Sequence, residues 1–394
     1  MKILKSQFSY FLLLIAGALV LRFVLDRLLE EGNPSLLRLA GAFLIILFGT
    51  FFVLKGTAKI IEETTGVLSH RTKLAGGVLQ SFGTAFPDMV LGIVAAVVSL
   101  RVVKSDYALA VDYAIIAAAT TFGSNIYNIA HAIWCVFRQN LANKKEKEIL
   151  MFPFLSKIGK VIPISQHETK PNLKEFDTSI DVLNVLTLLT AVVAISMVLF
   201  GKVANPPPNI KGDLYQMIKP VGFAILLLGG FFVYFFRKSR REEHRLSVEE
   251  EENYYQKKSN FIIFLYLLFS GLAILLAAET MINAVKVFSD ITGLPFVVTG
   301  VLAGIIGCMG EIIVIHNFTV NPKGRLGDAV VGVAMDNIVT TIGASIVAVM
   351  GGIFLGGNAL ILIFIIILTL NTMLIWQISK LKNYFLNFKK VKSQ

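Results

Sequence analysis

The sequence predicts an all-α integral membrane protein with about ten transmembrane helices in two inverted-topology repeats. The first observation is composition: of 394 residues, 55% are hydrophobic and 16% are charged, and the mean hydropathy is +0.71. A soluble chain has about 25% charged residues. The second observation is a series of long apolar segments. The third is a pair of acidic residues, Asp88 and Glu311, inside two of these segments.

Ten apolar segments are long enough to cross a bilayer, which takes about 20 helical residues. The first segment follows Lys2 and Lys5 and resembles a signal sequence, but it is long, contains Arg22 and Asp26, and lacks a small-x-small cleavage site. We therefore expect it to be a retained helix. The segments are 8–29, 35–61, 74–100, 107–137, 178–200, 214–236, 260–285, 292–319, 326–350 and 353–378.

Lysine and arginine concentrate in alternate connections between these segments. Because basic connections stay on the cytoplasmic side, this pattern fits an even number of spans with both chain termini in the cytoplasm. We expect an integral protein of the plasma (cell) membrane. The basic connections are 62–73, 138–177, 237–259, 320–325 and the C-terminal sequence KLKNYFLNFKKVKSQ.

The spans and connections divide the chain into seven parts. The loop at 138–177 contains short apolar pieces such as ILMFPFL, which suit the membrane surface. Neither long connection is large enough for a folded sensor domain. The expected parts are an extra N-terminal helix (1–31), the first repeat (32–137), a cytoplasmic loop (138–177), helices closing the first repeat (178–236), a charged cytoplasmic linker (237–259), the second repeat (260–380) and a basic cytoplasmic tail (381–394).

The charge and the cysteines exclude other classes of protein. The net charge is +11, but the basic residues lie between apolar spans instead of forming a patch with exposed aromatic residues, so no nucleic-acid partner is expected. Cys135 and Cys308 both lie inside apolar segments, so a disulfide framework is not indicated. The expected partners are the lipid bilayer and inorganic cations.

Asp88 lies in the apolar stretch FGTAFPDMVLGIVAAVV, residues 82–98. A carboxylate at bilayer depth costs about 2.5–3.5 kcal/mol on insertion scales, so it indicates a function. Pro87 lacks a backbone N–H, and we expect it to open the helix and turn oxygen atoms near Thr84 toward a cavity. Oxygen ligands and a carboxylate at the midplane indicate a cation site.

Glu311 provides the second half of this site, within GVLAGIIGCMGEIIVIHNF. The span of Asp88 is predicted to run outward and that of Glu311 inward, five spans later, as an inverted repeat requires. Small residues precede each acid and allow close helix approach. The two acids are therefore expected to meet from oppositely directed helices.

The helix after each acid is also rich in polar residues. Ser124 and Asn128 are four residues apart and share a helix face. Serine and threonine are tolerated in membrane helices because they bond to their own carbonyls, whereas aspartate and asparagine beside them are not explained in this way. The polar residues are Thr120, Thr121, Ser124, Asn125 and Asn128 in one helix, and Asp336, Asn337, Thr340, Thr341 and Ser345 in the other.

The sequence GTAFPD followed by GSNIYN resembles the first signature repeat of the cation/calcium exchanger superfamily, the sodium/calcium and calcium/proton antiporters. The pattern of that family is close to GTSLPE followed by GSNIFN. The resemblance implies two inverted repeats in which the acid, nearby hydroxyls and the GSN helix line one ion site. In the first repeat it implies Thr84, Asp88, Ser124 and Asn128 as site residues.

The second repeat is degenerate by the same comparison. In GIIGCMGE, Gly310 replaces the proline, Gly307 and Cys308 replace the threonine and serine, and Glu311 alone is retained. The site is therefore expected to be asymmetric.

The helix that follows Glu311 fits the signature in two registers. Aligning MDNIVT with GSNIYN makes Asp336 and Thr340 the equivalents of Ser124 and Asn128, whereas aligning TTIGAS with TTFGSN leaves alanines at both coordinating positions. Helix rise places Glu311 and Asp336 near one level, which favours the first register.

These observations predict a transporter, not an enzyme: a secondary-active cation antiporter that exchanges Ca²⁺ for Na⁺ or H⁺ by alternating access, without a cofactor. One alternative is a degenerate exchanger homologue with a binding or scaffold role. A second is an intramembrane aspartyl hydrolase, which would require two aspartates on adjoining helices. The expected metal-binding residues are Thr84, Asp88, Ser124, Asn128, Glu311, Asp336, Asn337 and Thr340.

Overall fold

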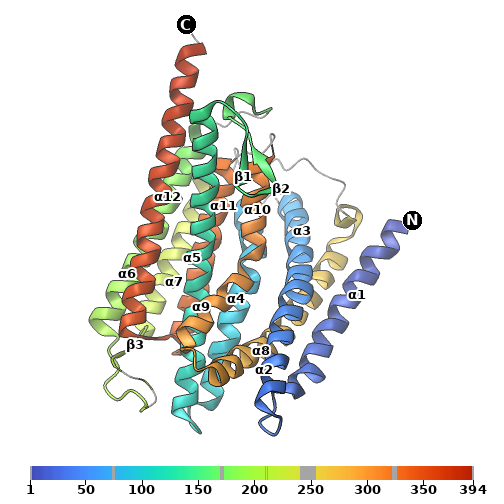
Figure 1. Ribbon diagram of the computed structural model, residues 1–394, viewed down its shortest axis with the longest axis vertical. Helices are drawn as coiled ribbons and strands as arrows, with labels where there is room; N and C mark the ends of the chain where they lie inside the picture. The colour runs from blue at the N-terminus through green and yellow to red at the C-terminus, as the bar shows by residue number, and fades with distance from the viewer. Residues whose placement is uncertain are drawn as a thin grey trace.

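The computed structural model describes residues 2–72, 76–168, 173–208, 210, 212–239, 254–321 and 326–392. It is a bundle of long helices that run roughly along one axis, with two small antiparallel sheets at its ends (Figure 1). The strands are β1 (Ile149–Phe152), β2 (Leu155–Val161), β3 (Leu214–Gln216) and β4 (Phe354–Gly356). We call the end of the bundle that carries the β1–β2 hairpin the hairpin end, and the other the opposite end.

Twelve α-helices are present in the described part of the chain, and a π-helical turn, Gly49–Leu54, joins the second to the third. The helices are α1 (Lys2–Phe23), α2 (Ser35–Phe48), α3 (Lys55–Thr72), α4 (Gly76–Val102), α5 (Tyr107–Lys145), α6 (Leu173–Phe200), α7 (Lys219–Ser239), α8 (Asn260–Thr292), α9 (Phe296–Gly307), α10 (Met309–Val320), α11 (Leu326–Met350) and α12 (Gly357–Lys392).

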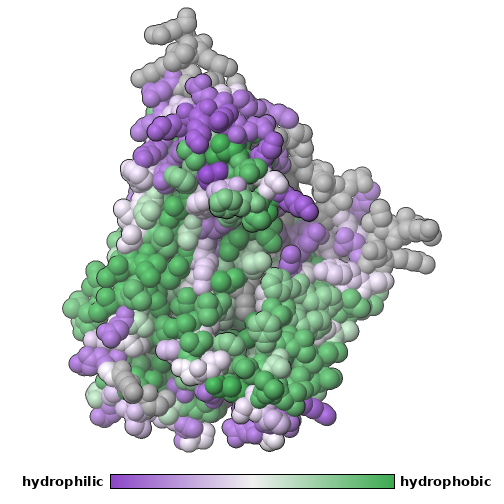
Figure 2. Space-filling view, viewed as in Figure 1, coloured by the Kyte–Doolittle hydropathy of each residue, from purple (hydrophilic) through white to green (hydrophobic). Residues whose placement is uncertain are grey.

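The helices form an integral membrane protein. Within the described residues, 8 helical segments are long and apolar enough to cross a membrane, and α7, α9 and α10 contain shorter apolar segments. Hydrophobic side chains cover a broad belt of the surface, and hydrophilic ones gather at the hairpin end and along the opposite end (Figure 2). Taking α9 and α10 as two halves of one span and α2 with α3 as another, the helices correspond to the ten predicted spans.

Local sequence explains where the long helices α5 and α8 begin and where α8 ends. Asp106 precedes α5 and its carboxylate accepts a hydrogen bond of 2.9 Å from the backbone N–H of Leu109. Ser259 caps α8 in the same way through Ile262, at 3.3 Å. Helix α8 ends at Gly293, whose φ of 71° is the left-handed conformation that glycine adopts without strain.

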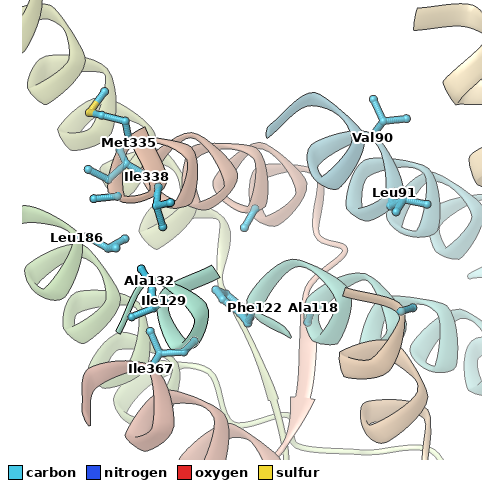
Figure 3. Close-up of a cluster of buried hydrophobic side chains, with 14 of the residues drawn as sticks. Val90, Leu91, Ala118, Phe122, Ile129, Ala132, Leu186, Met335, Ile338 and Ile367 are labelled. Carbon is cyan, nitrogen blue, oxygen red and sulfur yellow. The ribbon is translucent and has the colours of Figure 1, made fainter. Parts of the chain in front are cut away.

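Helices α5 and α11 form the interior of the bundle. In their most apolar windows 83% and 89% of the residues are buried, against 28–50% in the other long spans. Helix α5 is packed between α4, α9, α11 and α12, and Figure 3 shows its side chains Phe122, Ile129 and Ala132 within the buried hydrophobic cluster. Polar groups on α5 and α11 are therefore surrounded by other helices.

Contacts between α4 and the interior helices define its direction. Ser99 donates a hydrogen bond of 2.6 Å to the carbonyl oxygen of Ala110, and Gly92 lies against Thr121, so α4 and α5 are antiparallel. Helix α11 is parallel to α4. Gly343 contacts Met89, and further along both segments Gly352, just after α11, contacts Ala96. Helices α4 and α11 therefore point toward the opposite end.

The α9–α10 pair runs the other way. Gly300 lies against Ala119 and Gly304 against Ser124, so α9 is parallel to α5. The helix that carries Asp88 and the broken helix that carries Glu311 thus run in opposite directions, as predicted. The two pairs, α4 with α5 and α9–α10 with α11, have inverted orientations.

Several boundaries differ from the sequence predictions. Helix α4 continues through Pro87, so the expected opening near Thr84 is absent; the chain is instead interrupted at Cys308, between α9 and α10. The expected span at 214–236 begins with strand β3, and the helix starts at Lys219. The expected tail at 381–394 is largely a continuation of α12, to Lys392.

The expected loop at 138–177 is partly structured. Helix α5 continues to Lys145, and the apolar ILMFPFL piece forms strand β1, the turn and the start of strand β2. Within the charged linker expected at 237–259, residues 240–253 lie outside the described part of the chain.

Candidate ion site

Asp88 is buried within α4, with 1% of its surface exposed. Neither carboxylate oxygen has a hydrogen-bond partner among the described residues. The Ser124 hydroxyl on α5 lies near the carboxylate, but it donates its hydrogen to the carbonyl oxygen of Thr121, at 2.8 Å. Asp88 therefore lies buried in the helix bundle without a protein donor to its carboxyl group.

Glu311 lies in the first turn of α10, directly after the interruption at Cys308. Its side chain is 2% exposed, and both carboxylate oxygens lack a hydrogen-bond partner among the described side chains and backbone. Cys308 has φ −92° and ψ 8°, in the sparsely populated bridge region. A helix N-terminus carries partial positive charge, which stabilises a carboxylate placed in its first turn.

Asp336 and Asn337 bring the interior helix α11 to the same place. Asp336 and Asp88 are both close enough to Glu311 to act on it electrostatically. Asp336 is 5% exposed and Asn337 is fully buried. Three membrane-buried carboxylates, from α4, α10 and α11, therefore share one electrostatic environment.

A hydrogen bond between amides links the two inverted pairs. Asn128 Nδ2 on α5 donates to Asn337 Oδ1 on α11 at 3.1 Å. The other amide atoms, Asn128 Oδ1 and Asn337 Nδ2, are buried and have no partner in the described structure. Asn128 thus offers a free carbonyl oxygen, whereas the Asn337 oxygen is already engaged.

The remaining predicted site residues are placed as follows. The buried Thr340 hydroxyl donates to the carbonyl oxygen of Asp336, one turn earlier in α11, at 2.8 Å. Its oxygen still has a lone pair for a cation. Thr84 belongs to α4, but its side chain lies outside the described part of the structure.

Two further polar residues are not among the predicted site residues. Glu62, on α3, is partly buried and acts electrostatically on Glu311. The sequence prediction places Glu62 in the connection at 62–73, whereas α3 continues through this position. The sequence signal for a longer helix is EETT, which contains no turn residue. Asn125 was noted as polar but not placed in the site; it is 1% exposed and its Oδ1 has no partner in the described part.

The acids do not form a closed cage in this conformation. Among the described residues, no group of three histidine, cysteine, aspartate or glutamate side chains is close enough to hold a metal ion. The arrangement instead places carboxylates on separate helices around an interrupted span. Such a set can converge on a cation when the helices move.

The solved structures that this chain resembles include an ion exchanger. The H⁺/Ca²⁺ exchanger CAX matches with a TM-score of 0.55 and 14% identity, over 99% of this chain and 98% of that chain. The native structure of YfkE matches with a TM-score of 0.54 and 12% identity, over 95% of this chain and 97% of that chain. The sodium–calcium exchanger NCX_Mj gives 0.46 and 14%, over 88% and 96%.

No protein-family profile matches the sequence, and no curated protein matches it. Sequence identities of 12–14% show similarity of fold alone. Because the match covers almost the whole of both chains, the similarity includes every helix that contributes to the candidate site. The chain therefore has the fold of the Ca²⁺/cation exchangers.

Proposed function

We propose that the protein is a secondary-active cation antiporter that exchanges Ca²⁺ for Na⁺ or H⁺. The observation that carries the proposal is the pair Asp88 and Glu311: two buried carboxylates without hydrogen-bond partners in the described structure, on oppositely directed helices of an exchanger fold. One protein of similar fold is named as an H⁺/Ca²⁺ exchanger.

Electrostatics supports a cation as the substrate. Burying a carboxylate without a partner is unfavourable by several kcal/mol, unless a cation or a proton neutralises it. Asp88, Glu311 and Asp336 together can bind a divalent cation. Na⁺ ions or protons can replace that cation on the same carboxylates. Because the competing ions neutralise the same carboxylates, one ion must leave before the other binds, and this competition couples the two fluxes.

The donor atoms suit hard cations. Carboxylate, amide and hydroxyl oxygens are the ligands of Ca²⁺, which takes 6–8 of them. Asp88, Glu311 and Asp336 supply the charged oxygens, and Asn128, Ser124, Thr340 and Thr84 supply neutral ones. We assign Asn337 a different role from the one expected, because its oxygen accepts the Asn128 hydrogen bond: it orients Asn128 toward the ion.

Orientation follows from the basic connections. The described residues of 138–168 and the C-terminal part of α12, which are rich in lysine and arginine, lie at the hairpin end (Figure 1), and we infer that this end faces the cytoplasm. Helices α3 and α8 pack against α4 at the periphery of the site. Rocking of these helices against the interior pair would open the carboxylates to alternate sides.

Ion flux in proteoliposomes tests the proposal. We expect wild-type protein to accumulate Ca²⁺ when a Na⁺ or H⁺ gradient is imposed, and Asp88→Asn or Glu311→Gln to reduce that flux at least about tenfold, because each removes one charge from the site. Asp181→Asn, an exposed acid on α6, is the matched control and should keep wild-type flux. Cation binding without flux would instead favour the scaffold alternative, and unchanged flux in both site variants would contradict the assignment.

A further inference from the structure

Gly307, the last residue of α9, lies in direct contact with Asp88. A Cβ atom built on Gly307 would be 1.4 Å from Asp88 Oδ1, 2.5 Å from its Cγ and 3.1 Å from its Cα. The first two distances are far shorter than any nonbonded contact. A side chain at 307 and the present position of the Asp88 carboxylate therefore exclude each other.

The contact differs from the other close contacts of α9. Gly300 and Gly304 of the same helix lie against α5, where a Cβ would meet Ala119 Cβ at 2.6 Å and Ser124 N at 2.7 Å respectively. Those contacts are ordinary close helix packing. At Gly307 the nearest atoms instead belong to an ionisable side chain of α4, so the missing side chain makes room for a charge.

Gly307 and Thr84 occupy corresponding places in the two halves. Each lies four residues before the acid of its own half, Glu311 and Asp88 respectively. In the first half this place carries a hydroxyl, and in the second half it provides space into which the acid of the first half fits. The glycine that stands in place of threonine in the second repeat thus leaves the space that the Asp88 carboxylate occupies.

We propose that Gly307 is a specificity-determining residue of the candidate ion site. Because Gly307 has no side chain, the Asp88 carboxylate fits against the interruption between α9 and α10, and we call this space beside Gly307 the seat. The inference rests on the proposed antiport function. Glu311 begins α10 just beyond this interruption, so the seat fixes the spacing between the two carboxylates. Selectivity between cations of different radius depends on such spacing. Gly307 is a positioning residue and acts through Asp88.

A stability cycle tests the contact without any transport. We expect Gly307→Ala to lower the melting temperature in detergent by about 3 °C or more, as overpacking does, and by less than half as much in an Asp88→Ala background, where the carboxylate is gone. Gly332→Ala on α11, where nothing lies within 4 Å of the added Cβ, is the matched control and should leave the melting temperature unchanged. Equal losses in both backgrounds would overturn the seat.

An ion series tests selectivity. Half-saturating concentrations for Mg²⁺, Mn²⁺, Ca²⁺ and Sr²⁺ are measured by competition with Ca²⁺ flux in wild type, Gly307→Ala and Gly332→Ala. We expect Gly307→Ala to change the ratio between small and large ions by about tenfold, because displacing Asp88 alters the spacing. A merely destabilised protein would lose flux for all ions in proportion, and that outcome would overturn the inference while the antiport function stands.

A second variant keeps the inference testable if Gly307→Ala does not fold. Asp88→Glu keeps the charge but has a longer side chain that the seat does not accommodate, so the ion ratio should change there too; an unchanged ratio would contradict the inference. Recovery of folded protein in Asp88→Ala/Gly307→Ala after failure of Gly307→Ala alone would support the seat. A wild-type protein that neither binds nor transports any of the four cations would overturn the proposed function itself.

Discussion

At the scale of single residues, the candidate site contains buried polar atoms that differ in whether they are satisfied. The Thr340 hydroxyl is bonded to a carbonyl of its own helix, whereas the carboxylates of Asp88 and Glu311 and the free carbonyl oxygen of Asn128 have no partner among the described residues. Buried polar groups are normally paired. We therefore propose these unpaired oxygens as the atoms that bind the cation.

The Asn128–Asn337 bond gives a prediction at this scale. Asn337→Leu removes the acceptor of Asn128 Nδ2 and leaves a buried donor unsatisfied, which costs about 1–3 kcal/mol. We expect a lower melting temperature and weaker cation binding in the same variant, because Asn128 loses its orientation. Thr341→Val is the control, since its hydroxyl bonds only to the carbonyl oxygen of Asn337 within α11, at 2.8 Å. Equal effects of the two substitutions would contradict a role for the bridge.

At the scale of elements, the β1–β2 hairpin connects the helices of the site at the hairpin end. Trp134 Nε1 on α5 donates to the carbonyl oxygen of Met151 at 3.2 Å, and His316 Nε2 on α10 donates to that of Ile158 at 2.8 Å. Phe152 stacks with His131 and His316 at ring-centroid distances of 6.5 and 6.1 Å. The hairpin thus holds together the two helices that carry Asn128 and Glu311.

The two phenylalanines of this hairpin provide a matched test. Phe152→Ala removes the ring between α5 and α10, so backbone amides at 149–161 should exchange hydrogen faster by about tenfold or more. Phe154, two residues later at the turn, is 96% exposed, and Phe154→Ala should leave exchange unchanged. Hydrogen exchange followed by mass spectrometry measures both. Protection that survives in Phe152→Ala would show that the ring does not hold the hairpin.

The interrupted helix shows why some elements could not be predicted. Proline marked α4 as the helix to be opened, but α4 continues through Pro87. Helices in membranes can tolerate a proline. The real interruption lies in the glycine-rich α9–α10 segment, where Gly300 and Gly304 serve packing and Gly307 precedes the break. Glycine has both uses in membrane helices, so the sequence pattern alone does not separate them.

At the scale of the whole molecule, most of the architecture follows from the sequence. Apolar length predicted the spans, and the position of two costly acids on segments of opposite direction predicted the inverted pairs that the structure contains. The contribution of Glu62 and the seat of Asp88 on Gly307 depend on contacts between helices far apart in the chain. Such contacts leave no periodic pattern in a single sequence, and they emerge only once the helices are packed.

The central claim is that the two inverted halves build one shared cation site. Equilibrium dialysis of radioactive Ca²⁺ with purified protein, in detergent and without Na⁺, tests it directly when wild type is compared with Asp88→Asn and Glu311→Gln. A shared site predicts that either substitution alone removes high-affinity binding, since each acid supplies part of the same coordination shell. Undiminished affinity and stoichiometry in either single variant would contradict the account.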